Sequence, residues 1–280
     1  MNSGDDRENL ALLRKIIFLA AYHSRTGKAH LASSYSVVEI LYTLYLKGIM
    51  NYRVTEPEWN GRDRLVLSKG HASLALYAVM GMAGFFDTNE LESSFCYPNS
   101  RFGAEPNMHE LIGIEASTGS LGHGISLGIG MAIAFKKDNS QNRVFVIIGD
   151  GESQEGSVWE AVMAAANFHL DNLTVILDCN GVQEMGTVKE ISGIQNWATK
   201  WDSFGWDVES ADGHNIDSLY KMLSLNKKNN SPNLIIAKTV KGKGVSIMEN
   251  DATRWHYKLP SKRELKVFLN ELSISESDLK

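Results

Sequence analysis

Cysteine, proline and long apolar runs are scarce in this chain of 280 residues, which has two cysteines and five prolines. Cys96 and Cys179 lie far apart and lack the spacing of a metal site. No apolar stretch reaches the roughly 20 residues that span a bilayer, and the acidic, polar N-terminus does not resemble a signal peptide. We therefore expect a reduced, cytoplasmic protein that has no membrane partner.

An excess of positive charge is also lacking. The net charge of −5 and the lack of a long Lys/Arg run argue against nucleic acid as a partner. The short basic cluster 238–243 could bind one anionic ligand or could be a solvated strand end, and the sequence leaves both open. The length permits one large α/β domain or two small ones. Since no linker is evident, we predict a single domain over residues 1–280.

Hydrophobic periodicity predicts the elements of this domain. Helical spacing alternates with short apolar runs, an order that favours an α/β fold in which a parallel sheet carries helices on both faces. Residues 87–115 are expected to be irregular, and the polar C-terminal end to be frayed. We expect helices over 8–23, 35–47, 71–86, 121–135, 159–169, 215–226 and 261–272, and strands over 63–67, 144–148, 173–177, 206–209 and 234–240.

Two polar motifs follow neighbouring predicted strands. Gly149-Asp150-Gly151 comes directly after the first strand of a strand–helix–strand unit, and Asn180 follows the second. Each motif alone would be typical of a turn. Because parallel strands of such a unit end at the same edge of the sheet, Asp150 and Asn180 can meet at one cation. Oxygen ligands with open positions suit Mg²⁺, which also takes phosphate oxygens, and the flanking glycines let a diphosphate approach closely.

This pattern resembles the thiamine-diphosphate signature, which begins with Gly-Asp-Gly and ends in Asn. The chain from about residue 8 to 260 resembles the amino-terminal part of transketolase. The resemblance implies the thiamine-diphosphate-binding fold, of which this would be the diphosphate-binding domain. It further implies that Asp150, Asn180 and the main-chain carbonyl of Val182 hold Mg²⁺, or Ca²⁺ or Mn²⁺ in its place, against the diphosphate.

Three further segments extend the resemblance around the cofactor. His71 lies in the run Asp63–Ala72, where it could cap a helix or donate to an anion at the helix start; the family's histidine contacts the diphosphate. In the family, the turn that Thr118–Gly124 resembles lies along the thiazolium and diphosphate. A Trp-His pair late in the family's sequence brings a histidine near the diphosphate and the substrate channel. The implied cofactor-binding residues are His71, Gly119, Ser120, Leu121, Gly149, Asp150, Gly151, Asn180 and His256.

Departures from the family pattern fall on the substrate side. His30 resembles a histidine that lines the substrate channel, although Ala29 replaces the family's glycine and nearby serines could simply cap a helix. The resemblance implies that His30 and His256 are catalytic, with His30 transferring protons or binding substrate hydroxyls. Glu105 stands where the family has histidine, and Tyr257 where it has glycine. A carboxylate in place of an imidazole should change the selectivity for the substrate.

The family also implies a partner. Glu155 and Glu160 follow Gly-Asp-Gly on a helix, where most glutamates are solvated, but the corresponding glutamates in the family gather at a dimer interface near the cofactor. The family's catalytic glutamate, which tautomerises the aminopyrimidine, lies in a second domain. This chain therefore resembles the amino-terminal subunit of a split transketolase, which would need a carboxy-terminal subunit carrying that glutamate and would form an α2β2 heterotetramer.

The expected activity is the transfer of a two-carbon ketol unit from a ketose, or ketose phosphate, to an aldose. Alternatives are the alpha subunit of a 2-oxo acid dehydrogenase, another thiamine-diphosphate enzyme of specialised sugar metabolism, and a non-enzymatic cofactor-binding module. The runs Ser68–Ser73 and Gly119–Gly122 favour transketolase over the dehydrogenase. Intact Asp150, Asn180 and His71 argue against a degenerate module.

Overall fold

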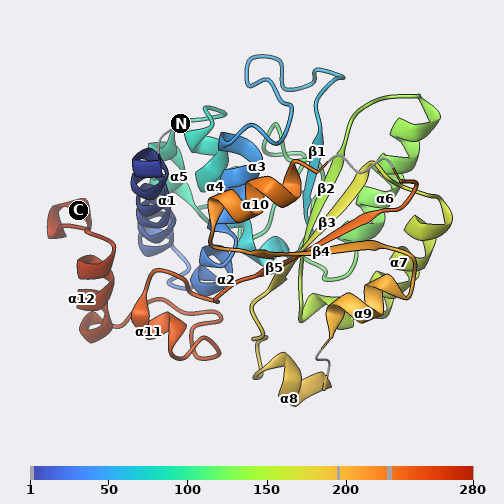
Figure 1. Ribbon diagram of the computed structural model, residues 1–280. Coiled ribbons are helices and arrows are strands. Elements are labelled where there is room, and N and C mark those ends of the chain that lie inside the picture. The colour runs from blue at the N-terminus through green and yellow to red at the C-terminus, as the bar shows by residue number, and fades with distance from the viewer. Residues whose placement is uncertain (1–2, 194–195, 226–228, 280) are drawn as a thin grey trace.

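All five strands found in residues 3–193, 196–225 and 229–279, the residues that the computed structural model describes, belong to one parallel sheet (Figure 1). The strand order is β1-β2-β3-β5-β4. In the register of β2 and β3, Gly149 pairs with Asp178, so the two strands end side by side. The strands are β1 (Arg64–Leu67), β2 (Val144–Gly149), β3 (Leu173–Cys179), β4 (Asp207–Asp212) and β5 (Asn233–Lys238).

The central strands have the continuous apolar sequences of strands that are covered on both faces. Every residue from Val144 to Ile148 in β2 is buried. β-branched side chains predominate in this run, and they pack well on a pleated surface. The edge strand β4 is less buried and more polar, because it pairs with β5 alone.

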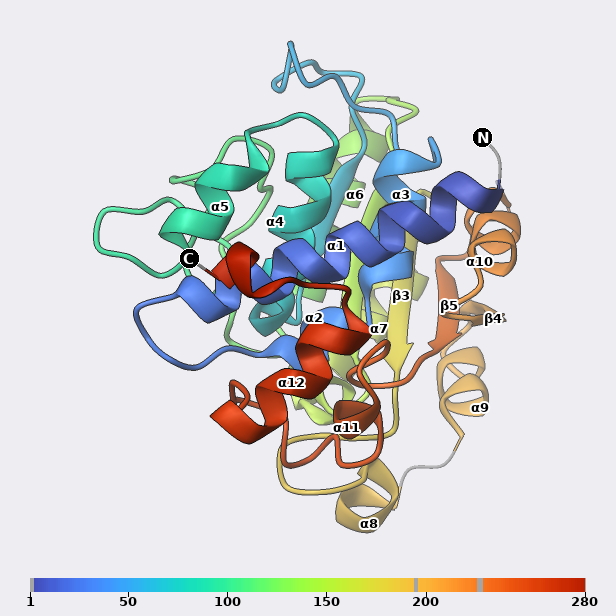
Figure 2. The same ribbon diagram turned by 90° about the vertical axis from the view of Figure 1, so that its left-hand side faces the viewer.

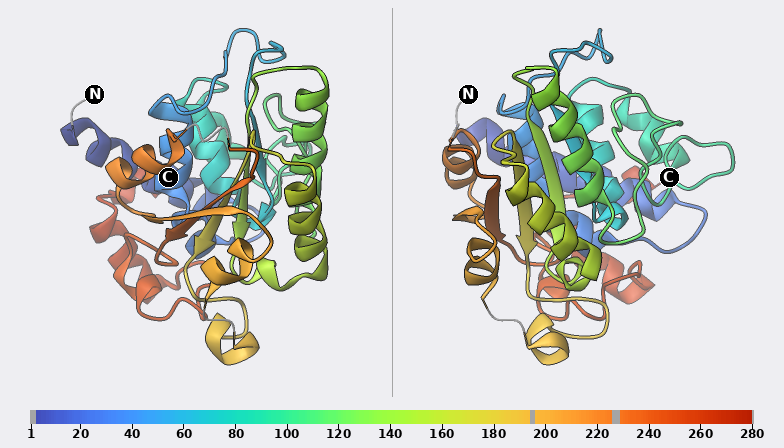
Figure 3. Two further views of the ribbon diagram at one scale, coloured as in Figure 1. Left: turned by 45° about the vertical axis from the view of Figure 1, so that its right-hand side comes forward. Right: turned by 90° about the vertical axis from the view of Figure 1, so that its right-hand side faces the viewer.

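Helices cover both faces of the sheet, as Figure 3 shows, which confirms the predicted architecture. One face carries α6 (Gly124–Lys137), α7 (Gly156–Asn167) and α9 (Trp197–Asp202). The other carries α1 (Ser3–His23), α2 (Leu31–Tyr35), α3 (Val38–Leu46), α4 (Ser73–Met82), α5 (Thr88–Ser94), α10 (Ile216–Leu223) and α12 (Lys262–Glu271). The short helices α8 (Val188–Ser192) and α11 (Ser246–Glu249) lie beyond the end of the sheet toward which β3 runs (Figure 2).

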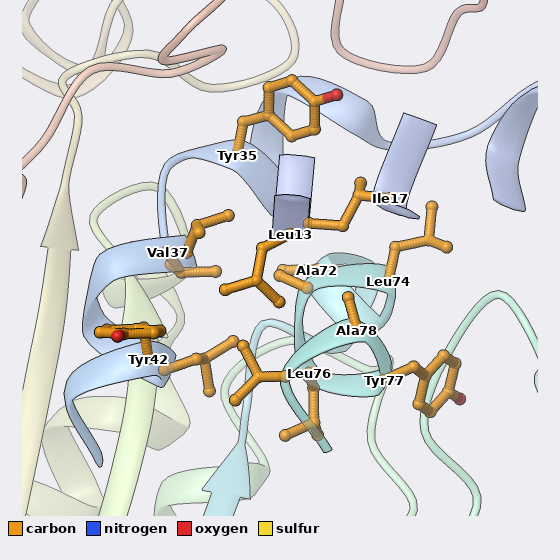
Figure 4. Packing of buried hydrophobic residues seen from close by; sticks show 14 of the residues in the cluster. Leu13, Ile17, Tyr35, Val37, Tyr42, Ala72, Leu74, Leu76, Tyr77 and Ala78 are labelled. Carbon is orange, nitrogen blue, oxygen red and sulfur yellow. The ribbon is translucent and has the colours of Figure 1, made fainter. Parts of the chain in front are cut away.

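Each face has its own apolar core. On the α1 side, Leu13 and Ile17 of α1 lie near Val37 and the side chains of α4 (Figure 4). On the α6 side, helix and sheet approach closely, because a Cβ on Gly128 would come within 2.4 Å of Val146 Cγ2. Glycine at this position therefore lets α6 lie directly against β2. In the described part of the chain, no helix combines the length and apolarity needed to cross a bilayer.

Two expectations were wrong. The segment 87–115 is not wholly irregular, since α5 begins there, with the Asp87 side chain capping its first turn and Leu91 buried against the core. The described residues before the C-terminus are not frayed, because Glu276–Leu279 form a 3₁₀ turn and Asp278 accepts a hydrogen bond from Lys15 at 3.0 Å. Both segments are short and polar, so their order comes from caps and single tertiary contacts, which hydrophobic periodicity does not detect.

Candidate functional site

Asp150 and Asn180 follow β2 and β3 and line the same cavity, which has a volume of about 520 Å³. Asp150 is buried, and its carboxylate accepts hydrogen bonds from the main-chain N–H of Gly151 at 2.9 Å and of Gly181 at 2.6 Å. Because Gly181 follows Asn180, these bonds tie the two strand ends together. The two residues thus lie at one sheet edge, as the motif spacing predicts, while their role as metal ligands stays a prediction.

The third predicted ligand, Val182, lies on the same wall of the cavity. The Asn180 amide donates to Asp178 Oδ2 at 3.0 Å and accepts from the Val182 N–H at 3.1 Å. The Val182 carbonyl accepts a hydrogen bond from Lys241 Nζ at 3.1 Å. One carboxylate, one amide oxygen and one main-chain carbonyl therefore lie along one stretch of wall, and all three are hard oxygen donors of the kind that Mg²⁺ prefers.

A buried ion pair, which was not predicted from the sequence, lies behind this wall. Lys69 Nζ lies 2.5 Å from Asp178 Oδ2, and both side chains are almost fully buried. Asp178 also accepts hydrogen bonds from Ser36 and Thr239. Burial alone would raise the pKa of Asp178, but Lys69 and these hydrogen bonds hold it below its ordinary value. The position of Asp178, two residues before Asn180 at a strand end, was the available signal.

The carboxylate of Asp150 has a perturbed pKa. Burial, together with the negative charge of Asp178, raises the pKa of Asp150 to about 6. A divalent cation beside Asp150 would favour its ionised form. Among the described residues, no group of three or more His, Cys, Asp or Glu could hold a metal. The predicted ligands include only one such residue, so the donor set fits a cation that takes its remaining ligands from phosphate and water.

Three histidines from distant parts of the chain form one cluster beside this wall. The ring centroid of His30 lies 5.2 Å from that of His71 and 5.0 Å from that of His256, and the latter two are 5.9 Å apart. The ring nitrogen Nδ1 of His30 is 3.1 Å from the main-chain carbonyl of His256. All three line the cavity. The predicted diphosphate-side and substrate-side histidines therefore lie within one continuous surface.

Each of these imidazoles is held in its neutral form. Burial lowers the pKa of His256 to about 3 and that of His71 well below its ordinary value, and the charges of Lys241 and Lys69 add to both shifts. Burial also lowers the pKa of His30. A neutral imidazole can donate one hydrogen bond and accept another, so the cluster can position hydroxyl groups and exchange protons with them.

The lysines of the basic cluster 238–243 differ in how far they are exposed. Lys238 is exposed, whereas Lys241 is 4 % exposed and lines the cavity. Lys241 Nζ donates to Val182 and lies 3.0 Å from His256 Nδ1. Burial lowers the pKa of Lys241 to about 8, with the charge of Lys69 acting in the same direction. The sequence left open whether this cluster binds an anionic ligand or is a solvated strand end. Of its residues, Lys241 alone fits the binding of an anion.

The glycine-rich turn closes another side of the cavity. Gly119 and Leu121 line it, whereas Ser120 does not, because its hydroxyl lies 3.4 Å from His123 Nδ1. Glu105 also lines the cavity and packs on Gly119, where a Cβ would come within 2.9 Å of Glu105 Cγ. Tyr77 donates to the Glu105 carbonyl at 3.1 Å and fixes the backbone, while the side chain is exposed.

A buried glutamate that was not predicted from the sequence joins these segments. Glu152 accepts hydrogen bonds from Ser68, from the Gly122 N–H at 2.9 Å and from the Gly149 N–H at 3.0 Å. Its burial raises its pKa, although the hydrogen bonds oppose the shift. Glu152 therefore connects the ends of β1 and β2 to the glycine-rich turn.

The two predicted interface glutamates lie differently. Glu155 is exposed at the start of α7 and lines the cavity, whereas Glu160 is exposed farther along α7 and does not line it. The structure holds a single copy of the chain, so an interface role for either glutamate stays a prediction. Cys96 and Cys179 are both free thiols.

Tyr257 lies beside the histidines, in a small neighbouring pocket that His30 and His71 also line. Its ring lies 4.4 Å from that of His30, with 32° between the ring planes, and it is 45 % exposed. Lys28 Nζ lies 5.8 Å from the centre of the Tyr257 ring. The residue that departs from the family pattern therefore touches the histidine predicted to face the substrate.

Comparisons with known proteins agree with this fold and site. Residues 11–261 match the family described as transketolase, thiamine diphosphate binding domain. The chain is 39 % identical over 236 residues to a 6-deoxy-6-sulfo-D-fructose transketolase subunit of a Clostridium species, covering 84 % of this chain and 85 % of that protein. It is 37 % identical over 261 residues to an apulose-4-phosphate transketolase subunit of Phocaeicola vulgatus, covering 93 % of this chain and 91 % of that protein.

A solved structure gives the same result. The chain superposes on transketolase from Campylobacter jejuni with a TM-score of 0.85 and 27 % identity. The alignment covers 100 % of this chain and 45 % of that transketolase, so the likeness concerns less than half of the larger protein. Because the family match extends over most of the chain and includes every segment that builds the cavity, the protein belongs to the transketolase family, and what it contains of that family is the thiamine-diphosphate-binding domain.

Proposed function

We propose that the cavity binds the diphosphate of thiamine diphosphate through a Mg²⁺ ion held by Asp150, Asn180 and the Val182 carbonyl. Ca²⁺ or Mn²⁺ could take the place of Mg²⁺, since both accept the same oxygen donors. The observation that carries the proposal is the arrangement of these three oxygen donors on one wall at adjacent strand ends. Lys241 and His71, which line the same cavity, supply donors for the diphosphate oxygens.

Lys241 is the chain's strongest candidate for a direct diphosphate contact. Its ammonium group is buried, and within the described residues its hydrogen-bond partners are the Val182 carbonyl and His256 Nδ1. When a cation binds the Val182 carbonyl, the Lys241 ammonium group loses this hydrogen bond. It can then turn toward the cavity and donate to an anion. The backbone of Gly119 and Leu121 and the glycines beside Asp150 allow the same anion to approach the main chain closely.

We further propose that the chain acts as a transketolase together with a separate carboxy-terminal subunit. The bound cofactor supplies a carbanion-stabilising centre. His30 and His256, both neutral, would hold the substrate hydroxyls and move protons to and from them. Two relatives of nearly the same length are named as transketolase subunits, which supports a separate partner chain. We propose that this partner carries the catalytic glutamate and that the two chains form an α2β2 assembly with Glu155 and Glu160 at the interface.

The proposed donor is a ketose other than the ordinary pentose phosphates. The relatives are named for a sulfonated ketose and for apulose 4-phosphate, which supports specialised sugars as substrates. Glu105 and Tyr257 lie where a substrate would pass the histidines. A carboxylate accepts hydrogen bonds and repels anions, so Glu105 would favour a hydroxyl over a phosphate at that position. A cytoplasmic location stays a prediction from the sequence.

The first test measures turnover of the isolated chain and of the chain mixed with its carboxy-terminal partner. Ketose phosphates, sulfonated ketoses and 2-oxo acids serve as donors, each with thiamine diphosphate and Mg²⁺. We expect activity only in the mixture and only with ketoses. Turnover by the isolated, homogeneous chain would refute the need for a partner, and decarboxylation of a 2-oxo acid would favour the dehydrogenase alternative.

A further inference from the structure

A second buried network lies outside the cavity, behind the turn that carries Lys241. Arg14 of α1 donates through Nη2 to Glu39 Oε1 of α3 at 2.6 Å, and His214, which follows β4, lies with Nδ1 3.0 Å from Glu39 Oε2. Both Arg14 and Glu39 are largely buried. Burial alone would raise the pKa of Glu39, but the hydrogen bonds from His214 and Arg14 hold it below its ordinary value.

The hydrogen bonds of His214 determine which of its nitrogens carries the proton. The Val240 N–H donates to His214 Nε2 at 2.8 Å, so Nε2 must be the acceptor. Nδ1 therefore carries the hydrogen and donates it to Glu39. A neutral imidazole thus connects the buried carboxylate of Glu39 to the main chain at Val240.

Arg14 reaches the same turn from its other side. Its Nε donates to the Lys243 carbonyl at 2.8 Å, and a Cβ on Gly244 would come within 2.8 Å of the Arg14 side chain. The turn is closed by a hydrogen bond from the Lys243 N–H to the Val240 carbonyl at 3.2 Å. The network therefore holds the turn at both ends, Val240 and Lys243.

The side chain between these two contacts is Lys241. Its Nζ lies against Val182 and His256 in the cavity. From the backbone of Lys241 to its ammonium group there are four rotatable methylenes, so the position of the charge depends on where the backbone is held. None of Arg14, Glu39 and His214 makes a hydrogen bond to Val182 or His256 in the described part of the chain.

We infer that Arg14, Glu39 and His214 are positioning residues that hold the Val240–Lys243 turn and so fix the Lys241 ammonium group for an anionic ligand. The network acts through the main chain of the turn and lies on the side of it away from the cavity. This inference rests on the proposed cofactor site, because it gives Lys241 a diphosphate to contact. It adds three residues from α1, α3 and the end of β4 to the machinery of the site.

Two substitutions at His214 separate its two hydrogen bonds. His214→Gln places an acceptor oxygen near the position of Nε2 and keeps the bond from Val240, whereas His214→Asn places a donor near the position of Nδ1 and keeps only the bond to Glu39. In the isolated chain, hydrogen exchange of the 240–244 amides should be at least about tenfold faster in the Asn variant than in the Gln variant. Arg14→Lys, which cannot span both Glu39 and Lys243, should loosen the same amides. His169→Asn, an exposed loop histidine, is the matched control.

The second measurement is the affinity of the assembled complex for thiamine diphosphate in the presence of Mg²⁺. His214→Asn should weaken it about fivefold, the effect of one hydrogen bond, and His214→Gln should stay close to wild type. In a Lys241→Met background the same His214→Asn change should have less than about a twofold effect, because the group it positions is gone.

These outcomes separate the inference from the proposed function. Unchanged amide exchange in both His214→Asn and Arg14→Lys would overturn the inference. A fivefold loss that persists at full size in the Lys241→Met background would also overturn it, because the network would then act on the fold as a whole. If the wild-type complex binds no thiamine diphosphate, the proposed function fails, and with it the role given to Lys241, whatever the exchange rates show.

Discussion

The inner and outer walls of the cavity are built in different ways. The inner wall, at the ends of β2 and β3, rests on buried groups that each have several partners: Asp150 in the wall accepts from two main-chain N–H groups, and Asp178 behind it accepts from four side chains. The outer wall consists of Glu105 in the cavity lining and Tyr257 in the pocket beside it; both are exposed and are placed mainly by ring contact or by their backbones.

This difference indicates where the site can change without loss of the fold. Removing a group from the inner wall leaves its buried polar partners without a hydrogen bond. The free-energy cost of such an unpaired buried group is larger than the contribution of the hydrogen bond itself. Changing a group on the outer wall exposes its neighbours to water, and a water molecule can replace a hydrogen bond that is lost. The inner wall is therefore suited to a ligand that stays the same, such as a cofactor, and the outer wall to substrates that differ between relatives.

The largest effect should come from Asp150, the only acidic group among the three predicted ligands. Asp150→Ala should weaken binding of thiamine diphosphate at low Mg²⁺ by more than about a hundredfold, because the cation loses its only charged protein ligand. Calorimetry on the assembled complex measures this. Asp171→Ala, which removes a carboxylate at the opposite end of the sheet, is the matched control. Undiminished affinity in Asp150→Ala would defeat the assignment of the metal site.

The next effect concerns stability. Lys69→Met should destabilise the chain by about 3–5 kcal/mol, because Asp178 would remain as an uncompensated buried charge. Lys136→Met, which breaks the exposed pair with Asp171, should cost less than about 1 kcal/mol. Denaturant unfolding of both variants gives the comparison. Adding Asp178→Asn to Lys69→Met should recover part of the loss, whereas equal costs for the two single variants would contradict the larger cost expected for removing a buried partner.

The inner wall was easier to predict from the sequence than the network that supports it. Asp150 and Asn180 could be paired because each follows an apolar strand, and parallel strands end at one edge. Asp178, Glu152 and His214 could not be found in this way. Their partners lie far away in the sequence: Lys69 is 109 residues from Asp178, and Glu39 is 175 residues from His214. No periodic pattern encodes such contacts, so only the packed helices and loops reveal them.

The same limit applies to the short elements. The central strands were predicted from continuous apolar runs, and the long helices from the helical period that burial of one face imposes. Helix α5 lies in a polar segment whose only fully buried residue is Leu91, so no period could be read there. The place of Glu105 on the substrate side was expected from the family resemblance, while its exposure and its contact with the glycine-rich turn became visible only in the structure.

A smaller effect is expected at the outer wall. Glu105→His should shift selectivity toward ordinary ketose phosphates, because an imidazole can donate where a carboxylate only accepts. One such hydrogen bond is worth roughly 1 kcal/mol, so kcat/KM for xylulose 5-phosphate should rise at least about fivefold. Glu110→His, on the same segment but not in the cavity lining, is the control. If the wild type already prefers xylulose 5-phosphate and the variant does not differ, Glu105 plays no part in selectivity.

The smallest effect lies between the two walls, at His256, and it appears as a dependence of stability on pH. Burial lowers the pKa of His256 to about 3, so the unfolded chain takes up this proton near pH 6.5 while the folded chain does not. Stability should therefore fall as the pH drops below about 6.5. From pH 6.5 to 5 the full effect would be about 2 kcal/mol, and partial exposure of the ring reduces it to about 1 kcal/mol.

Because asparagine does not titrate, His256→Asn should lose about 2 °C less in melting temperature over this range than the wild type. Melting curves of the cofactor-free chain, recorded with His169→Asn as the control, test this, and parallel pH profiles for wild type and His256→Asn would show that the imidazole is not held neutral by the fold.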